Sequence, residues 1–222
     1  KTTAMQNIST TNHKYMLVDS PQKRKDLLER LAQAKEFCFD TETTGIDPQN
    51  AELVGMSFAI NPGEAFFISL PDNYNDCHAI VHEFKAVFEN PAIGKVGQNI
   101  KYDIAMLKWY DVEVKGKLFD TMIAHYLLQP DMRHNMDVLA ETYLSYKTVS
   151  YDELTEKIRG SQLTMRQVQQ NKLAHLVDYA CEDADITLQL KYIFEPKLKE
   201  TSTIELFEKI EVNGQHAHPL FQ

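Results

Sequence analysis

The stretch EFCFDTETTG, residues 36–45, predicts a buried β-strand that ends in two carboxylates. Its apolar and aromatic first half favours the interior of a sheet. Because side chains alternate between the two faces of a strand, Cys38, Asp40 and Glu42 share one face. Two acids on one face at the carboxyl end of a strand are positioned to hold a common cation, although an isolated D-x-E pair is more often a pair of surface acids.

Further strands and helices are predicted on both sides of this stretch. The turn signal Asn61-Pro62-Gly63-Glu64 joins two strands into an antiparallel hairpin. The early part of the chain is predicted to form strands, the middle part alternates strands and helices, and the last part is helical. This order predicts an α/β fold, a mixed β-sheet flanked by α-helices. The predicted strands cover 15–18, 36–42, 53–60, 65–69 and 95–97; the predicted helices cover 21–34, 77–89, 100–110 and most of the chain from 120, with loops near 129–134 and 145–163.

Two of the predicted helices each direct one further acid toward the sheet. On a wheel of about 100° per residue, Asp183 lies in line with the apolar Ile186. In the same way Asp103 lies in line with Leu107. The other acids of the later helix form a separate polar stripe that is predicted to face solvent: Asp178, Glu182 and Asp185.

Several buried carboxylates repel one another unless cations hold them, so this set predicts a site for two divalent metal ions. Such sites cleave phosphodiesters. Asp40, Glu42 and Asp183 would bind the ion that activates the attacking water. Asp40 and a water held by Asp103 would bind the second ion, about 3.5–4 Å away, at the leaving oxygen. Tyr179, one helical turn from Asp183, would orient the water, with a core tyrosine as the equally weighted alternative.

The composition is that of an ordinary globular protein. The chain has 222 residues, of which 43% are hydrophobic and 25% charged, and this length fits one domain. The longest apolar runs fall short of the roughly 20 residues of a membrane span. Three unclustered cysteines indicate reduced thiols of a cytoplasmic protein. The net charge of -9 argues against binding of nucleic acid, because proteins usually bind nucleic acid through basic surfaces. We give the acidic motifs more weight than this charge.

The three acidic motifs resemble those of a known family. FDTETTG (39–45), VGQNIKYD (96–103) and YACEDADITLQL (179–190) look like the exonuclease motifs of the proofreading domain of bacterial DNA polymerase I, in the branch with tyrosine in the third motif. Any one motif is weak, but three in order are specific. The likeness covers roughly residues 15–211, through LFDTMIAHYLL (118–128), RHNMDVLAETYL (133–144), QLTMRQV (162–168) and ELFEKIE (205–211).

The resemblance implies a ribonuclease H-like fold that removes nucleotides from the 3′ end of DNA and releases 5′-monophosphates with Mg²⁺ or Mn²⁺. By position, the metal carboxylates of the family match Asp40, Glu42, Asp103 and Asp183, and its water-orienting tyrosine matches Tyr179. The residues that match its contacts to the DNA end are Ile46, Gln98, Asn99, Tyr102, Arg133 and Met165. An aromatic residue is usual where Met165 stands, so this position departs from the family pattern. Two further acids, Asp120 and Asp137, each precede or open a predicted helix, and we interpret them as N-caps and not as catalytic acids.

The resemblance also implies how the chain is organised. We expect a disordered or linker segment at 1–13, the exonuclease domain at 14–200, and the start of a polymerase thumb-like helix with a truncated tail at 201–222. The chain opens with Lys1 and has no secretion signal, so we expect a monomeric part of a larger, nucleoid-associated bacterial polymerase. The expected partners are a single-stranded or frayed 3′ end of DNA and the polymerase domain of the same polypeptide, with no membrane.

Two other functions stay open. The domain could be a structural platform in a polymerase that has lost the activity, but that hypothesis predicts missing acids, and all four stand in this chain. It could also be a ribonuclease D-like exonuclease that trims RNA. The run TTG after Glu42 and the thumb-like ending favour the polymerase I family over this alternative.

Overall fold

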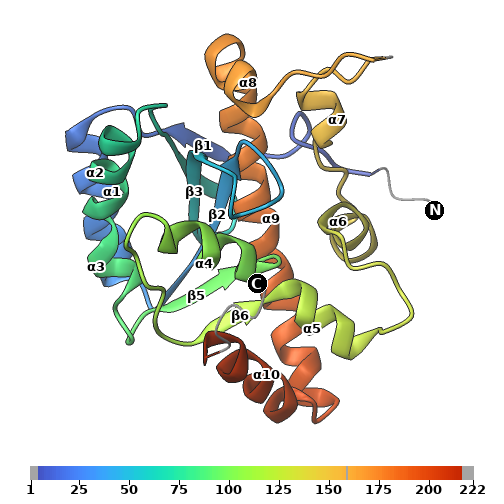
Figure 1. Ribbon diagram of the computed structural model, residues 1–222. Coiled ribbons are helices and arrows are strands. Elements are labelled where there is room, and N and C mark those ends of the chain that lie inside the picture. The colour runs from blue at the N-terminus through green and yellow to red at the C-terminus, as the bar shows by residue number, and fades with distance from the viewer. Residues whose placement is uncertain (1–4, 159, 217–222) are drawn as a thin grey trace.

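A computed structural model describes residues 5–158 and 160–216 (Figure 1). Within these residues the strands form a mixed six-stranded sheet in the order β1-β4-β3-β2-β5-β6. The central pairs β2–β3 and β3–β4 are antiparallel, whereas β1–β4, β2–β5 and β5–β6 are parallel. The bounds are β1 Lys14–Leu17, β2 Glu36–Thr43, β3 Leu53–Asn61, β4 Glu64–Ser69, β5 Gly94–Gly97 and β6 Leu118–Asp120.

Helices cover both faces of this sheet. Phe37 and Phe39 of β2 pack on the side of the first four helices, and Cys38 packs on the side of the long helix α9, as strand alternation requires. Figure 1 shows α1–α3 on one side and α9 on the other. The helix bounds are α1 Pro21–Gln33, α2 Tyr74–Glu83, α3 Lys85–Phe88, α4 Ile100–Lys108, α5 Thr121–Leu128, α6 Met136–Leu144, α7 Tyr151–Leu154, α8 Met165–Asn171, α9 Leu173–Glu200 and α10 Ile204–His216.

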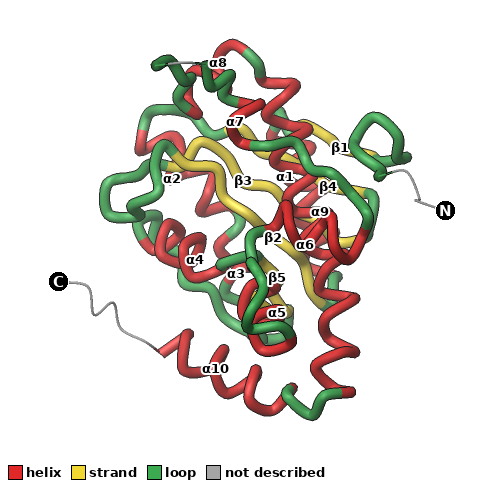
Figure 2. Tube along the Cα trace, turned by 90° about the vertical axis from the view of Figure 1, so that its right-hand side faces the viewer, coloured by secondary structure: helices red, strands yellow, loops and turns green. Residues whose placement is uncertain are grey.

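The α9 helix is the main support of the sheet. It has 28 residues and runs across the strands from β1 to β5 (Figure 1). Its buried stripe includes Leu176, Ala180 and Leu190, which belong to the same core as Val54 of β3 and Val96 of β5. At its far end a short loop leads into α10, which runs along the lower side of the molecule in Figure 2.

The predicted solvent-facing stripe of α9 is wrong at two of its three acids. Asp178 is exposed, but Glu182 and Asp185 are buried. The Asp185 carboxylate accepts hydrogen bonds from the Tyr15 hydroxyl and the Gly63 N–H, both at 2.8 Å. The wheel gave the relative directions of these side chains correctly, but it could not show that β1 and the chain after α6 also pack on this helix.

Local chemistry explains several helix ends. The Asp120 side chain caps α5 by accepting from the N–H of Met122, as predicted. The same prediction is wrong for Asp137, because α6 is preceded by Asn135 and the Asp137 carboxylate instead accepts from the Thr148 hydroxyl at 2.8 Å. The short strand β6 and the separation of α2 from α3 were not predicted.

The ends of the chain are partly described. Gln6, in the segment expected to be a linker, pairs with the chain next to Tyr146 through backbone hydrogen bonds to residues 145 and 147. Residues 1–4 and 217–222 of the predicted terminal segments lie outside the described residues. Among the helices that the structure describes, none combines the length and the apolar character needed to cross a membrane.

Candidate active site

Three acids meet where β2 ends beside α9. Asp40 and Glu42 lie on one face of β2, and Asp183 comes from α9. One carboxylate oxygen from each lies within 4.8 Å of those of the other two. Glu42 and Asp183 are buried and Asp40 is partly buried. The structure therefore brings together three of the four acids that the sequence predicted as metal ligands.

Burial makes this group of acids electrostatically costly. Loss of solvent raises the pKa of Asp40 to about 7. Burial, followed by the nearby Asp40 charge, raises the pKa of both Glu42 and Asp183 well above the usual range. Among the residues that the structure describes, no lysine or arginine forms an ion pair with these carboxylates. The repulsion is offset either by protons, as the raised pKa values indicate, or by a cation from solution that binds the ionised carboxylates.

Two oxygen atoms support the same conclusion. Glu42 Oε1 and Asp183 Oδ1 are buried and have no hydrogen-bond partner among the described residues. Buried polar atoms without a partner are rare, because each costs about 1–3 kcal/mol. Carboxylate oxygens are the ligands that Mg²⁺ and Mn²⁺ prefer, so the donor set fits a hard divalent ion.

Asp103 lies next to this group but is held differently. It stands in the first turn of α4 and is 3% exposed. Its Oδ1 accepts hydrogen bonds from the backbone N–H of Thr41 at 2.9 Å and from the Thr41 hydroxyl. Burial and the charge of Asp40 raise the pKa of Asp103, whereas the bonds from Thr41 lower it. Asp103 is thus fixed beside Asp40, outside the group of three.

Tyr179 lies one turn before Asp183 on α9 and is partly buried. Burial, then the charges of Asp183 and Glu42, raise the pKa of its hydroxyl well above the usual range. The side chain is therefore near both carboxylates and keeps its proton at neutral pH. A protonated phenol can donate one hydrogen bond and accept others.

The loop after β2 carries the most exposed apolar side chain of the predicted DNA contacts. Ile46 is 96% exposed. Next to it, the Tyr102 hydroxyl donates to the Gly45 carbonyl and shares a hydrogen bond of 2.7 Å with the Thr43 hydroxyl. Tyr102 thereby ties this loop to α4, so two of the predicted DNA-contacting residues lie side by side.

Three more predicted contacts surround the start of α4. Asn99 has a left-handed backbone, with φ of 55°, and its side chain is exposed. The Gln98 side-chain amide donates to the carbonyl of His134 at 2.7 Å and accepts from the Thr121 hydroxyl. Arg133, the residue before His134, is exposed. Gln98 therefore anchors the loop that carries Arg133.

The structure does not bring Met165 to the surface of this site. Met165 is 3% exposed and belongs to the core beneath α8. The helix begins at this residue, after Thr164, which forms a capping box with Gln167, and the Met165 side chain packs in the core. A contact between Met165 and a base would need a displacement of α8.

The comparisons with known proteins agree with this geometry. A family model described as 3′-5′ exonuclease matches residues 15–199. The chain belongs to this 3′-5′ exonuclease family. DNA polymerase I of Borreliella burgdorferi is 34% identical over 209 residues, which are 92% of this chain and 22% of that protein. DNA polymerase I of Pseudomonas aeruginosa is 35% identical over 208 residues, 84% of this chain and 22% of that protein. The domain is homologous to the proofreading domains of these polymerases, and it spans about a fifth of their length.

Solved structures confirm the predicted α/β, ribonuclease H-like fold. The catalytic core of RRP6 from Trypanosoma brucei superposes with a TM-score of 0.73 at 18% identity, over 97% of this chain and 56% of that chain. RNase D of Escherichia coli gives a TM-score of 0.66 at 16% identity, over 93% and 50%. Brucella melitensis NrnC with bound Mg²⁺ gives 0.63 at 18%, over 96% and 99%. At these identities the likeness concerns the fold.

The sequence did not predict that two further residues hold the segments around this site in place. Besides capping α5, Asp120 accepts from the N–H groups of Asn99 and Ile100, both at 3.0 Å, and so fixes the start of α4. Arg166 donates to the carbonyls of Leu53 and Leu70 at the ends of β3 and β4. An acid that precedes a helix signals a cap, but these long-range partners have no sequence signal.

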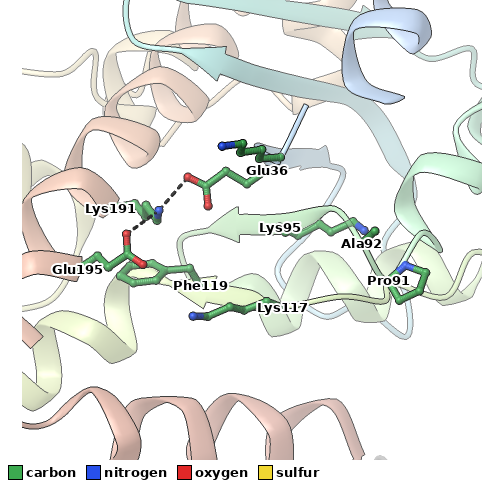
Figure 3. A pocket seen from close by; sticks show the side chains of 10 residues that line it. Glu36, Pro91, Ala92, Lys95, Lys117, Phe119, Lys191 and Glu195 are labelled. Carbon is green, nitrogen blue, oxygen red and sulfur yellow. Dashed lines mark hydrogen bonds and ion pairs between the residues drawn. The ribbon is translucent and has the colours of Figure 1, made fainter. Parts of the chain in front are cut away.

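A cavity of about 240 Å³ lies at the opposite edge of the sheet, where β2 and β5 begin (Figure 3). Lys191 crosses it and forms ion pairs with Glu36 at 2.7 Å and Glu195 at 2.8 Å. Glu36 and Glu42 are six residues apart on one strand, which is about 20 Å at the rise of a β-strand. This cavity is therefore separate from the carboxylates.

Proposed function

We propose that this domain is the proofreading part of a DNA polymerase I and hydrolyses the last phosphodiester at the 3′ end of DNA, releasing 5′-mononucleotides. The observation that carries the proposal is the group Asp40, Glu42 and Asp183, which each place a carboxylate oxygen within 4.8 Å of the others. Two buried oxygens of this group, Glu42 Oε1 and Asp183 Oδ1, have no hydrogen-bond partner among the described residues. Membership in the 3′-5′ exonuclease family supports the same reaction.

Mg²⁺ or Mn²⁺ is the proposed cofactor, with two ions as the proposed number. Asp40, Glu42 and Asp183 would hold one ion, and Asp40 together with Asp103 would serve the other. When bound, such ions lower the pKa of a water molecule and neutralise charge that develops on the phosphate. Thr41 holds Asp103 in place, so that one of its oxygens is fixed before substrate arrives.

Tyr179 has the proposed role of orienting the attacking water. Its hydroxyl stays protonated, because burial and the carboxylates around it oppose ionisation. A neutral hydroxyl beside Asp183 and Glu42 can donate to or accept from a water molecule without adding negative charge. Tyr179 would hold this water in line with the phosphorus atom.

The proposed DNA contacts lie around the same edge of the sheet. Exposed Ile46 can pack against the terminal bases, and Arg133 can pair with a phosphate. Asn99 and Tyr102 stand beside them at the start of α4, and Gln98 acts through the loop that it anchors. These contacts address base faces, sugar and backbone, so the enzyme would cleave without sequence preference.

The acidic chain would depend on a partner to hold duplex DNA. The net charge of -9 disfavours a strong grip on phosphates. The polymerase I relatives are about five times longer than the matched segment, and a polymerase domain of the same polypeptide would supply the missing positive surface. We accordingly propose a domain at 14–200, a linker before it, a thumb-like helix from 201, and action as a monomer on bacterial DNA in the cytoplasm.

RNA trimming is the second candidate function. The observation that favours it is the likeness to the RRP6 core and to the protein named RNase D, an exoribonuclease. Both share less than a fifth of their residues with this chain, whereas the polymerase I relatives share about a third. We therefore prefer a DNA end as substrate.

The decisive experiment compares single-stranded DNA and RNA of the same sequence, labelled at the 3′ or the 5′ end, with Mg²⁺, Mn²⁺ or EDTA. We expect mononucleotides from the 3′ label of DNA, a shortening ladder from its 5′ label, and no product in EDTA. Asp183→Asn should lower the rate by at least about 100-fold, because loss even of a residue that only supports a metal ligand costs 10–100-fold.

Asp178→Asn is the matched control, since Asp178 is an exposed acid on the same helix. It should leave the rate unchanged. Faster cleavage of RNA than of DNA would favour the trimming enzyme. A folded protein that cleaves neither substrate with any metal would contradict the proposed function of the isolated domain and favour a platform role.

A further inference from the structure

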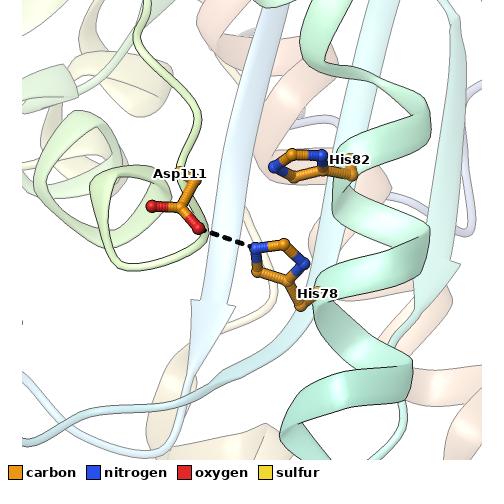
Figure 4. A group of neighbouring side chains, drawn as sticks. All are labelled: His78, His82 and Asp111. Carbon is orange, nitrogen blue, oxygen red and sulfur yellow. Dashed lines mark hydrogen bonds and ion pairs between the residues drawn. The ribbon is translucent and has the colours of Figure 1, made fainter.

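A second group of metal-binding side chains lies outside the acidic site. His78 and His82 are one turn apart on α2 and share a face of that helix. Asp111 follows α4 and has a left-handed backbone, with φ of 58°. One ligand atom of each residue lies within 4.8 Å of those of the other two. Figure 4 shows both imidazole rings directed toward the Asp111 carboxylate.

The cluster contains a polar atom that is unsatisfied. His82 Nε2 is buried and has no hydrogen-bond partner among the described residues. The His78 and His82 rings stack, with centroids 4.3 Å apart and planes at 24°. His78 Nε2 lies 2.9 Å from Asp111 Oδ2. Two neighbouring imidazoles therefore face one carboxylate, and only one of them pairs with it.

We propose that His78, His82 and Asp111 form a second metal site, one for Zn²⁺ or a similar borderline divalent ion. Two imidazole nitrogens and one carboxylate oxygen are a ligand set of zinc proteins, with water as the fourth ligand. Imidazole selects Zn²⁺ over Mg²⁺, which prefers oxygen ligands. The site thus differs in chemistry from the all-carboxylate group and goes beyond the proposed nuclease function.

The geometry needs only a small adjustment to hold such an ion. Ligand atoms around tetrahedral zinc are about 3.4 Å apart, given bonds near 2.0–2.1 Å. The His78–Asp111 contact of 2.9 Å would open slightly, and a pair of ligand atoms at the limit of 4.8 Å would close by at most about 1.4 Å. The Asp111 side chain is 75% exposed, so it is free to move by this amount.

The surrounding charges allow a cation here. The ammonium of Lys85 lies beside the cluster and donates to the backbone carbonyl of Asp111. The same ammonium forms an ion pair with Glu89 at 2.6 Å, which offsets its charge.

A bound ion would join α2 to the end of α4. These elements already meet where the Tyr74 hydroxyl donates to the carbonyl of Trp109 at 2.7 Å. The site lies with the helices on the first face of the sheet, whereas Asp183 belongs to α9 on the other face. Zn²⁺ would therefore stabilise the folded chain without entering the catalytic group.

The test is calorimetric titration of the whole chain with ZnCl₂ in excess Mg²⁺, which occupies the carboxylate group. The variants are His78→Ala, His82→Ala and Asp183→Asn. His13→Ala is the matched control, because it removes an imidazole that stacks on Tyr15. We expect the affinity for Zn²⁺ to fall at least about 10-fold in His78→Ala and His82→Ala, and to be unchanged in Asp183→Asn and His13→Ala.

Thermal unfolding gives a second readout that does not depend on catalysis. Zn²⁺ should raise the unfolding midpoint of the wild type and of Asp183→Asn, but not that of His82→Ala, since a ligand stabilises only the state that binds it. Nuclease activity with Mg²⁺ should be the same in His82→Ala and wild type. Zn²⁺ binding that survives both histidine changes, or that is lost in Asp183→Asn, would overturn the proposed site, as would no binding at all.

Discussion

At the scale of single residues, Tyr179 offers the sharpest test of how water is positioned. Tyr179→Phe keeps the ring and removes the hydroxyl beside Asp183. We expect kcat to fall about 100-fold with little change in KM, because the hydroxyl would act on the attacking water and not on the bound DNA. Single-turnover digestion of labelled DNA measures this.

The pH profile distinguishes this role from that of a general base that ionises during the reaction. Because the pKa of Tyr179 is raised well above its usual range, ionisation of the hydroxyl does not limit the wild-type rate near neutral pH. The wild type and Tyr179→Phe should therefore show profiles of the same shape at different heights. A variant with wild-type kcat would leave Tyr179 as a core tyrosine.

Glu182 stands next to Asp183 in the chain, yet we predict that it acts only on stability. It is fully buried and accepts hydrogen bonds from the Tyr146 hydroxyl at 2.6 Å and from the N–H of Val149 at 2.7 Å. Glu182→Ala leaves both donors without a partner and should cost about 1–3 kcal/mol. Urea unfolding measures this loss, with Asp178→Asn as the exposed control.

The remaining folded Glu182→Ala molecules should digest DNA at the wild-type rate. A large loss of activity at full stability would instead place Glu182 in the site. The neighbours Glu182 and Asp183 show how far single residues could be predicted from the sequence.

The helical wheel separated Asp183 from Glu182 correctly. It nevertheless assigned Glu182 to solvent, because the part of the chain that covers Glu182 is distant in sequence.

At the scale of elements, β3 depends on a glycine. A Cβ atom at Gly55 would lie 2.2 Å from Phe67 Cζ of the neighbouring strand β4 and 3.0 Å from the Ile68 carbonyl oxygen. Gly55→Ala should therefore destabilise the protein by about 1–3 kcal/mol, as overpacking does. Gly55 is also paired with Glu42, so its displacement should weaken the site as well.

Gly45→Ala is the control for this prediction, because none of the described atoms lies within 4 Å of the added Cβ. Denaturant unfolding of the two variants should show a loss for Gly55→Ala and almost none for Gly45→Ala. Equal stability of both variants would mean that the Phe67 ring moves aside at no cost. The prediction would then be wrong.

Elements with a strong period were predictable, and short ones were not. The apolar and acidic alternation of β2 and the hairpin of β3 and β4 were read correctly from the sequence. Strand β6 has three residues, which is too few for a period to be seen. The burial of Met165 was missed because it depends on how α8 packs on the core beside residues distant in sequence, such as Val54.

At the scale of the whole molecule, three acids from two distant segments, β2 and α9, were predicted to meet, and they do. The prediction succeeded because each acid lay on the apolar face of its strand or helix. When these apolar faces are buried against one sheet, the acids on them are brought together. Asp103 joins the neighbourhood but is bound by Thr41. Spacing alone does not show which hydrogen bonds compete for an acid.

The acidic group should make the metal-free protein less stable as the pH rises. The pKa of Asp40 is raised to about 7 in the folded state, against about 3.9 when unfolded. Between these values the folded state holds more protons than the unfolded state, so the free energy of unfolding falls with increasing pH. In EDTA, we expect a loss on the order of 1 kcal/mol for each pH unit between about 4 and 7, and the contribution of Asp40 should level off above its folded pKa.

Mg²⁺ should reverse the sign of this dependence at the site, because a divalent ion binds the ionised carboxylates of the folded state and stabilises it more as the pH rises. Asp40→Asn removes one of the raised groups and should flatten the dependence in EDTA, while Asp178→Asn should leave it unchanged. Urea unfolding at several pH values, with EDTA or Mg²⁺, separates these cases. If the wild type and Asp40→Asn show the same dependence in EDTA, burial does not raise the pKa of Asp40 in the folded protein, and the physical argument for a metal at this site fails.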